Sequence, residues 1–260
     1  MIGPTVFITG AARGIGRGTA SALAESGCRL GLIDRDALAL GELAATLKAG
    51  GATVASAPAD VTDGRAVASA VALIASKIGD AEVLVACAGV GGLSRVPPDL
   101  DIDGLRATLE VNVVGVARAI EAVLPAMIAR RQGHIVGVSS VAGFRGLPWM
   151  ASYSASKAAV SAYLEALRPA LRLRGVTITT ACPGFVRTAL TEGTPFRNPV
   201  PMMEPEEAGR RIARAVFRRP RNCVFPWSTA VGMACLRMMP DRVFDWMMDR
   251  AGPRALDRDF

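Results

Sequence analysis

The sequence has a single histidine, no paired cysteines and no long uncharged stretch. His134 has no carboxylate beside it, so a histidine-based triad or a metal centre is not expected. The five cysteines are widely spaced and form no CxxC pair, which argues against a disulfide framework and favours a reducing, cytoplasmic setting. The longest uncharged run, Asn222 to Leu236, has 15 residues, fewer than the ~20 that span a bilayer. The first ten residues lack the basic segment of a secretory signal.

Positive charge exceeds negative charge, with 30 lysines and arginines against 23 acidic residues and a net charge of +7. Such an excess raises nucleic acid or an anionic membrane as a partner. The basic residues are spread along the chain and become dense only near a predicted helix at 205–219, whose opposite face is apolar. We therefore expect a solvated helix face and no nucleic-acid partner.

Short apolar segments alternate with longer amphipathic ones. The predicted strands are 5–9, 29–33, 53–59, 82–86 and 135–138, and the predicted helices between them are 17–26, 36–49, 63–78 and 103–130. Strands separated by helices of this length predict an α/β fold with a doubly wound parallel sheet. With 260 residues, 51% of them hydrophobic, we expect a single domain over residues 1–260. Ligands of such sheets bind at the carboxyl ends of the strands.

A glycine-rich turn, Gly10-Ala-Ala-Arg-Gly-Ile-Gly16, follows the first predicted strand and precedes a helix. Glycines let the backbone turn tightly and approach a phosphate, and the helix N-terminus offers free N–H groups. Asp34 ends the second strand 18 positions after Gly16, near the ~20-residue offset at which an acid meets the adenosine ribose. Arg13 and Arg35 could each pair with a 2′-phosphate. We favour NAD over NADP because the acid occupies the hydroxyl-binding position.

Tyr153 and Lys157 stand four positions apart in a predicted helix at 151–174, and this spacing puts them on one face. A close ammonium would lower the pKa of the phenol and let Tyr153 act as a general acid or base. By spacing alone, an ordinary surface pair is the more frequent arrangement. Asn112 lies between two valines, so it is either a satisfied core group or part of a polar relay.

Several motifs occur in the order and spacing of the short-chain dehydrogenase/reductase family, which the chain resembles over about residues 4–190. They are Thr9-Gly10 to Gly16, Asp60, Asn112, Ser140, Tyr153 and Lys157. Ser140 precedes Tyr153 by 13 positions, in a segment similar to the serine strand of the family. The segment Ala181 to Thr188 looks like its second cofactor-binding turn. Each motif is ordinary alone, but together they are specific.

The resemblance implies a Rossmann-like oxidoreductase that transfers a hydride between NAD, or else NADP, and an alcohol or carbonyl. Tyr153 would give or take the proton, and Ser140 would hydrogen-bond the reacting oxygen. Lys157 would hold the nicotinamide ribose and lower the pKa of Tyr153, while Asn112 would anchor a water. The other implied cofactor contacts are Gly10, Arg13, Gly14, Ile15, Gly16, Asp34, Arg35, Asp60, Val61, Ala88, Gly89, Pro183, Gly184, Val186 and Thr188. The alternative is a cofactor-binding regulatory protein of this fold without turnover, which would not need the complete set.

Two positions depart from the family pattern. Ala86-Cys87 stands where the family often has two asparagines before Ala-Gly, so an amide that braces the sheet is missing. Pro169 lies inside the helix of Tyr153, where it removes the bond to the carbonyl of Glu165 and should bend the helix beyond the site.

The substrate end of the chain is apolar. We expect the pocket mouth to comprise Val90 to Val96, Phe144, Leu147, Trp149, Met150 and a lid at about 189–204, which favours a lipophilic alcohol or carbonyl. The extension at 221–260 is rich in methionine and tryptophan. It could cover the pocket, pack in a homodimer or homotetramer, or make peripheral contact with a membrane through its apolar and arginine side chains.

Overall fold

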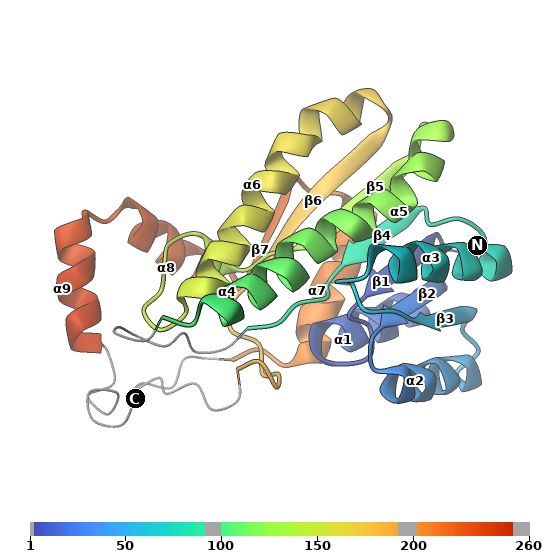
Figure 1. Cartoon of the computed structure of the whole chain (residues 1–260), viewed down its shortest axis with the longest axis horizontal. Helices are drawn as coiled ribbons and strands as arrows, with labels where there is room; N and C mark the ends of the chain where they lie inside the picture. The colour runs from blue at the N-terminus through green and yellow to red at the C-terminus, as the bar shows by residue number, and fades with distance from the viewer. Residues whose placement is uncertain (1–2, 92–99, 192–201, 252–260) are drawn as a thin grey trace.

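The computed structural model describes residues 3–91, 100–191 and 202–251 (Figure 1). Seven parallel strands form one sheet in the order β3-β2-β1-β4-β5-β6-β7. The strands are β1 (Thr5–Thr9), β2 (Arg29–Asp34), β3 (Val54–Pro58), β4 (Val83–Ala86), β5 (Gly133–Val138), β6 (Val176–Pro183) and β7 (Asn222–Phe225). The chain moves outward from β1 to β3 and then returns to β4 beside β1, and ligands bind at such a reversal of strand order. The predicted doubly wound α/β fold is confirmed.

Helices cover both faces of the sheet (Figure 1). They are α1 (Gly14–Glu25), α2 (Ala37–Ala49), α3 (Gly64–Ile78), α4 (Ile102–Leu109), α5 (Gly115–Ala129), α6 (Ala151–Leu173), α7 (Pro205–Arg218), α8 (Trp227–Met238) and α9 (Asp241–Ala251). In β1, Val6 and Ile8 belong to the core shared with α1 and α7, whereas Phe7 belongs to the core shared with α3, α5 and α6. This alternation is the period of two that a strand buried on both faces requires.

The predicted helix at 103–130 is three elements in one line, because the π-helical turn η1 (Glu110–Val114) joins α4 to α5. The sequence did not predict this turn. The stretch Ile102–Ala129 is the one described helix long and apolar enough to span a membrane, with a mean hydropathy of 1.6. Core helices of soluble proteins have the same composition, and Val116, Ile120 and Val123 lie in the core against the sheet.

The predicted basic face of α7 is confirmed, because Ile212 and Val216 are buried on one side while Arg210 and Arg214 are exposed on the other. The helix α6 continues through Pro169 to Leu173. The bend expected at this proline stays a prediction.

The C-terminal extension forms β7, α8 and α9, which the sequence analysis did not divide into elements. Figure 1 shows α8 and α9 at the end of the molecule beyond α6, opposite α2 and β3. Arg145, in the segment between β5 and α6, holds them. Its guanidinium donates to the carbonyls of Leu236 at 2.7 Å and Met239 at 2.6 Å, pairs with Asp241 at 2.8 Å, and lies 4.0 Å from the ring centroid of Phe244.

Candidate active site

A cavity of about 410 Å³ lies at the carboxyl ends of the central strands. It brings together most of the predicted site residues, namely Gly10, Arg13, Gly14, Ile15, Gly16, Asp34, Arg35, Gly89, Ser140, Tyr153, Lys157, Pro183, Gly184, Val186 and Thr188. These residues come from the ends of β2 and β6, from the segments that follow β1, β2, β4, β5 and β6, and from the starts of α1 and α6. The fold therefore assembles one site from positions spread over almost 180 residues of sequence.

The glycine turn forms a tight cradle at one wall of this cavity. Gly10 has a φ of 67°, and a Cβ there would lie 2.6 Å from the Cα of Ala88. A Cβ on Gly16 would lie 1.9 Å from the carbonyl oxygen of Gly10. In the described part of the chain, no side chain caps the N-terminus of α1. The cradle and the uncapped helix N-terminus fit the pyrophosphate of a dinucleotide.

Asp34 is held at the end of β2 by two backbone N–H groups. Its two carboxylate oxygens accept from Ala12 at 2.9 Å and from Asp36 at 3.0 Å. A carboxylate oxygen has further acceptor capacity, so Asp34 can still receive the hydroxyls of a ribose. The side chain lines the main cavity and a smaller neighbouring one of about 100 Å³.

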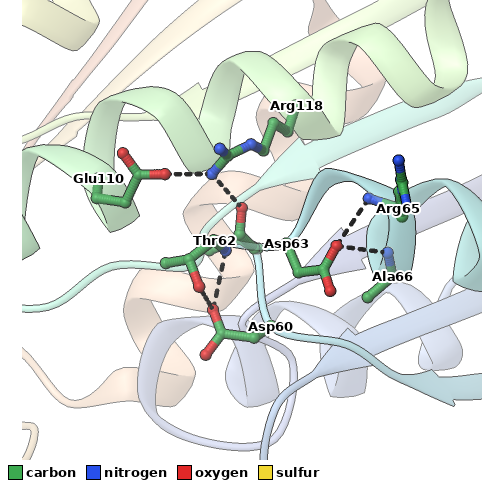
Figure 2. Close-up of polar contacts among 8 residues, drawn as sticks. Asp60, Thr62, Asp63, Arg65, Ala66, Glu110 and Arg118 are labelled. Atoms are coloured by element: carbon green, nitrogen blue, oxygen red, sulfur yellow. Dashed lines mark hydrogen bonds and ion pairs between the residues drawn. The ribbon is translucent and has the colours of Figure 1, made fainter.

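The smaller cavity contains three of the implied cofactor contacts, Asp60, Val61 and Ala88. Asp60 accepts from the backbone N–H of Thr62 at 2.9 Å and from its hydroxyl at 2.8 Å, and these bonds keep the pKa of Asp60 below its ordinary value. Figure 2 shows how α5 supports this corner. Arg118 pairs with Glu110 at 2.5 Å and donates to the carbonyl of Val61 at 3.4 Å, so it ties the corner to η1.

Lys157 and Tyr153 are fixed against the end of β5. The Lys157 ammonium donates to the carbonyl of Val138 at 3.0 Å, and the hydroxyl of Ser139 donates to the backbone carbonyl of Lys157 at 2.8 Å. The Ser140 hydroxyl accepts from Ala142 at 3.1 Å. These contacts lock the first turns of α6 to the strand that carries Ser140, and they keep the three side chains in one cavity wall.

Burial dominates the protonation of this group. It raises the pKa of Tyr153, although an interaction with the Ser140 hydroxyl partly lowers it, and it lowers the pKa of Lys157 to about 8. Burial of the phenol is the largest influence on this pKa. The Lys157 ammonium bonds to Val138 and lies 5.7 Å from the ring centroid of Tyr153, and the expected lowering of the Tyr153 pKa by Lys157 stays a prediction.

Asn112 lies in the π-helical turn and is fully buried. Its amide oxygen accepts from the N–H of Val90 at 2.8 Å, and its amide nitrogen donates to the carbonyl of Val90 at 2.8 Å and to the hydroxyl of Ser156 at 2.9 Å. The side chain does not line either cavity. Of the two alternatives from sequence, the satisfied core amide describes these contacts, and Asn112 positions the loop after β4 against α6. Its role toward a water stays a prediction.

Three lining positions belong neither to the predicted cofactor and catalytic residues nor to the predicted pocket mouth and lid. They are Cys87, Val138 and Ser139. Cys87 replaces the amide noted above, and the hydroxyl of Thr9 accepts from the N–H groups of Cys87 at 3.2 Å and Ala88 at 3.3 Å. Their place directly beside predicted site residues was the only signal that could have identified them.

The pocket mouth differs from expectation. Val90 lines the main cavity, but Phe144 and Leu147 pack instead on a small hydrophobic cluster with Val141 and Cys182. Trp149 and Met150 are likewise absent from the described lining. The partly buried Leu236 of α8 packs on the same cluster, so the inner side of the extension covers this segment. Residues 92–96 and most of the expected lid at 189–204 lie outside the described residues.

Within the described ranges, no group of three or more histidine, cysteine, aspartate or glutamate side chains is placed to hold a metal ion. His134 is buried and pairs with the hydroxyl of Thr177 at 2.8 Å. Burial lowers the pKa of His134 to about 4, so the ring is neutral at pH 7. This supports the structural interpretation of the histidine.

Comparison with known proteins finds short-chain dehydrogenases and related oxidoreductases. A family model described as short chain dehydrogenase matches residues 4–196. An uncharacterized oxidoreductase of Myxococcus xanthus is 39% identical over 241 residues, which cover 93% of this chain and 94% of the relative. The estradiol 17-beta-dehydrogenase 11 of Pongo abelii is 35% identical over 243 residues, which cover 92% of this chain and 80% of the relative.

Solved structures agree on the architecture. A short chain dehydrogenase/reductase from Burkholderia phymatum in complex with NAD has a TM-score of 0.82 and 26% identity, over 97% of this chain and 98% of that chain. A short chain dehydrogenase from Burkholderia cenocepacia in complex with NADP has a TM-score of 0.80 and 26% identity, over 95% of this chain and 98% of that chain. Both kinds of dinucleotide are thus bound by proteins of this architecture.

Proposed function

Since this chain belongs to the short-chain dehydrogenase family and is an oxidoreductase with a nicotinamide cofactor, we propose that it transfers a hydride between that cofactor and a lipophilic alcohol or carbonyl. The observation that carries the proposal is the shared wall of Ser140, Tyr153 and Lys157, in the same cavity as the glycine cradle. The alternative, a regulatory protein that binds the cofactor without turnover, has no use for an acid, a hydroxyl and an ammonium held together.

The chain's own residues have distinct chemical tasks in this proposal. A bound nicotinamide supplies or accepts the hydride. Tyr153 exchanges the proton with the substrate oxygen. Burial raises the pKa of the phenol, so the side chain is protonated at pH 7, which is the form that donates to a carbonyl. The Ser140 hydroxyl stabilises negative charge where it develops on that oxygen. Lys157, with a pKa of about 8, is mostly an ammonium at pH 7 and can hold a ribose hydroxyl.

We propose NAD as the preferred cofactor because Asp34 lines the cavity at the end of β2, where an acid would meet the adenosine ribose. A carboxylate accepts hydroxyl donors and repels a 2′-phosphate. The test is a titration with NADH and with NADPH, followed by nicotinamide fluorescence. Tighter binding of NADPH would overturn this preference.

The lipophilic substrate is supported by the apolar part of the cavity wall, which includes Val90, Val138, Val186 and Leu190. It is also supported by the relative named for estradiol, a lipophilic alcohol. A screen of hydrophobic alcohols, aldehydes and ketones with both cofactors, read at the nicotinamide absorbance, tests the proposal. Turnover with one of these classes is expected, and turnover only with small charged metabolites would contradict it.

We propose that the enzyme works in the cytoplasm as a homodimer or homotetramer. The five cysteines are free, as in a reducing compartment. The assembly is supported by apolar side chains exposed on α4, η1 and α6, with Ile102 50% exposed and Val114 and Tyr163 37% each. Light scattering of the purified chain measures the mass directly, and a monomer at micromolar concentration would refute the assembly.

A peripheral membrane contact through α8 is the remaining part of the proposal. Trp227, Val231 and Met238 follow helical spacing on its outer side and are 76%, 54% and 79% exposed, beside the exposed Arg237. Tryptophan and arginine side chains suit the headgroup region of an anionic bilayer. We expect sedimentation with phosphatidylserine vesicles that weakens in Trp227→Ser. Equal recovery in the supernatant with and without vesicles would exclude this contact.

A further inference from the structure

Two positive side chains, Arg13 and Arg35, and the carboxylate of Asp34 line the main cavity. Asp36 lies beside them, in contact with Arg13 and with Asp34, and its contact with Arg13 was not expected from the sequence. The Arg13 guanidinium does not stand free. Its Nη2 lies 2.6 Å and its Nε 3.2 Å from the same carboxylate oxygen of Asp36.

Asp36 is well placed to keep this partner. Its other carboxylate oxygen accepts from the N–H of Ala39 at 3.0 Å and so caps the N-terminus of α2. Its own N–H donates to Asp34 at 3.0 Å. One residue therefore fixes the start of α2, helps to orient Asp34 and occupies Arg13.

The arrangement has a consequence for the two dinucleotides. An unoccupied guanidinium beside Asp34 would attract the 2′-phosphate by charge and by paired hydrogen bonds. With Asp36 on Arg13, that attraction is offset, and a second carboxylate adds to the repulsion of a phosphate. The ribose of NAD has a free 2′-hydroxyl, so its binding does not require an unpaired Arg13. Asp36 therefore does not weaken the binding of NAD.

We infer that Asp36 is a specificity-determining residue, which favours NAD over NADP by holding Arg13 away from the 2′ position. This inference rests on the proposed function. It acts through Arg13 and is separate from the direct repulsion by Asp34.

The test uses Asp36→Asn, because an asparagine oxygen can still accept from Ala39 and cap α2 while the charge is lost. Dissociation constants for NADH and NADPH are measured by nicotinamide fluorescence in the full chain, with circular dichroism to verify the fold. We expect NADPH to bind about fivefold to twentyfold more tightly in the variant, since an exposed ion pair and one repulsive charge are removed. The constant for NADH should change less than about twofold.

Two further variants make the result specific. In the double variant Arg13→Ala/Asp36→Asn, most of the gain in NADPH affinity should be absent, because the guanidinium that would bind the 2′-phosphate is gone. Asp101→Asn makes the same chemical change at the N-cap of α4, where Asp101 accepts from Gly104 at 2.8 Å, and it should leave both constants unchanged.

The outcomes distinguish a failure of the proposed function from a failure of the inference about Asp36. If the wild-type chain binds neither dinucleotide, the proposed function fails together with the inference. If it binds them and Asp36→Asn leaves the ratio of the constants unchanged, or the full gain persists without Arg13, the inference alone is overturned.

Discussion

Lys157 should destabilise the fold that contains it, and its removal should make the protein more stable. The side chain is only 4% exposed, and burial lowers its pKa from 10.5 to about 8. This shift corresponds to a cost of about 3 kcal/mol for keeping the ammonium in the folded state at pH 7. Lys157→Met keeps a side chain of similar length and removes that cost. It also removes the hydrogen bond to the carbonyl of Val138, and this loss offsets about 1 kcal/mol of the gain. The free energy of unfolding should rise by about 2 kcal/mol.

The effect has a defined pH dependence. Because the pKa of this base is lower in the folded state, the unfolded chain binds more protons between about pH 8 and 10.5, and wild-type stability gains in that window as the pH rises. The full cost of burying the Lys157 ammonium applies below about pH 8, and at pH 9.5 about half of this cost remains. The advantage of Lys157→Met should therefore shrink to under about 1 kcal/mol at pH 9.5.

Urea denaturation at pH 7 and pH 9.5 measures both values, with turnover assayed on the same samples. Lys77→Met is the matched control, because Lys77 is exposed on α3 and its change should stay within about 0.5 kcal/mol. A Lys157→Met protein that is less stable than wild type at pH 7 would refute the reasoning. So would a gain in stability that does not change between the two pH values.

The remaining predictions concern groups away from the reacting atoms. Burial lowers the pKa of His134 from 6.5 to about 4, so stability should fall by up to about 3 kcal/mol as the pH decreases through that window. His134→Gln should lose most of this dependence, which urea denaturation at pH 7 and 4.5 would detect; an unchanged dependence would contradict the assignment. Arg145→Ala should release α8 and α9 and speed backbone hydrogen exchange there, whereas the exposed Arg237→Ala should not. Equal exchange in both variants would show that Arg145 does not hold these helices.

The sheet could be predicted because its strands are local features. Each of the runs that became β1 to β5 is apolar and bounded by turn residues, and the predicted bounds lie within two residues of the observed ones. The π-helical turn could not be predicted in this way. Asn112 is held there by Val90 and Ser156, and such contacts depend on the folded chain.

The C-terminal helices escaped prediction for another reason. The outer side of α8 presents Trp227, Val231 and Met238 instead of polar residues, so the helix lacks the amphipathic pattern by which a surface helix is identified. Its inner contacts run to Arg145 and to the cluster around Val141, both far away in sequence.

The candidate site was predictable in its residues and less so in its energetics. Spacing brought Tyr153 and Lys157 to one helix face, and the structure places both in one cavity. Spacing does not reveal that Lys157 bonds to Val138 or that burial raises the pKa of Tyr153. The partner of Arg13 also depends on the folded turn.

The central claim is that Tyr153 exchanges the substrate proton, and the two tyrosines of the chain allow a direct test. Tyr153→Phe removes only the hydroxyl in the cavity, and Tyr163→Phe removes the hydroxyl of the other tyrosine, on the same helix but 37% exposed. With a substrate from the screen, we expect Tyr153→Phe to lose about 10²-fold to 10⁴-fold in turnover while NADH fluorescence still reports binding, and Tyr163→Phe to behave like wild type. Wild-type turnover in Tyr153→Phe would contradict the account.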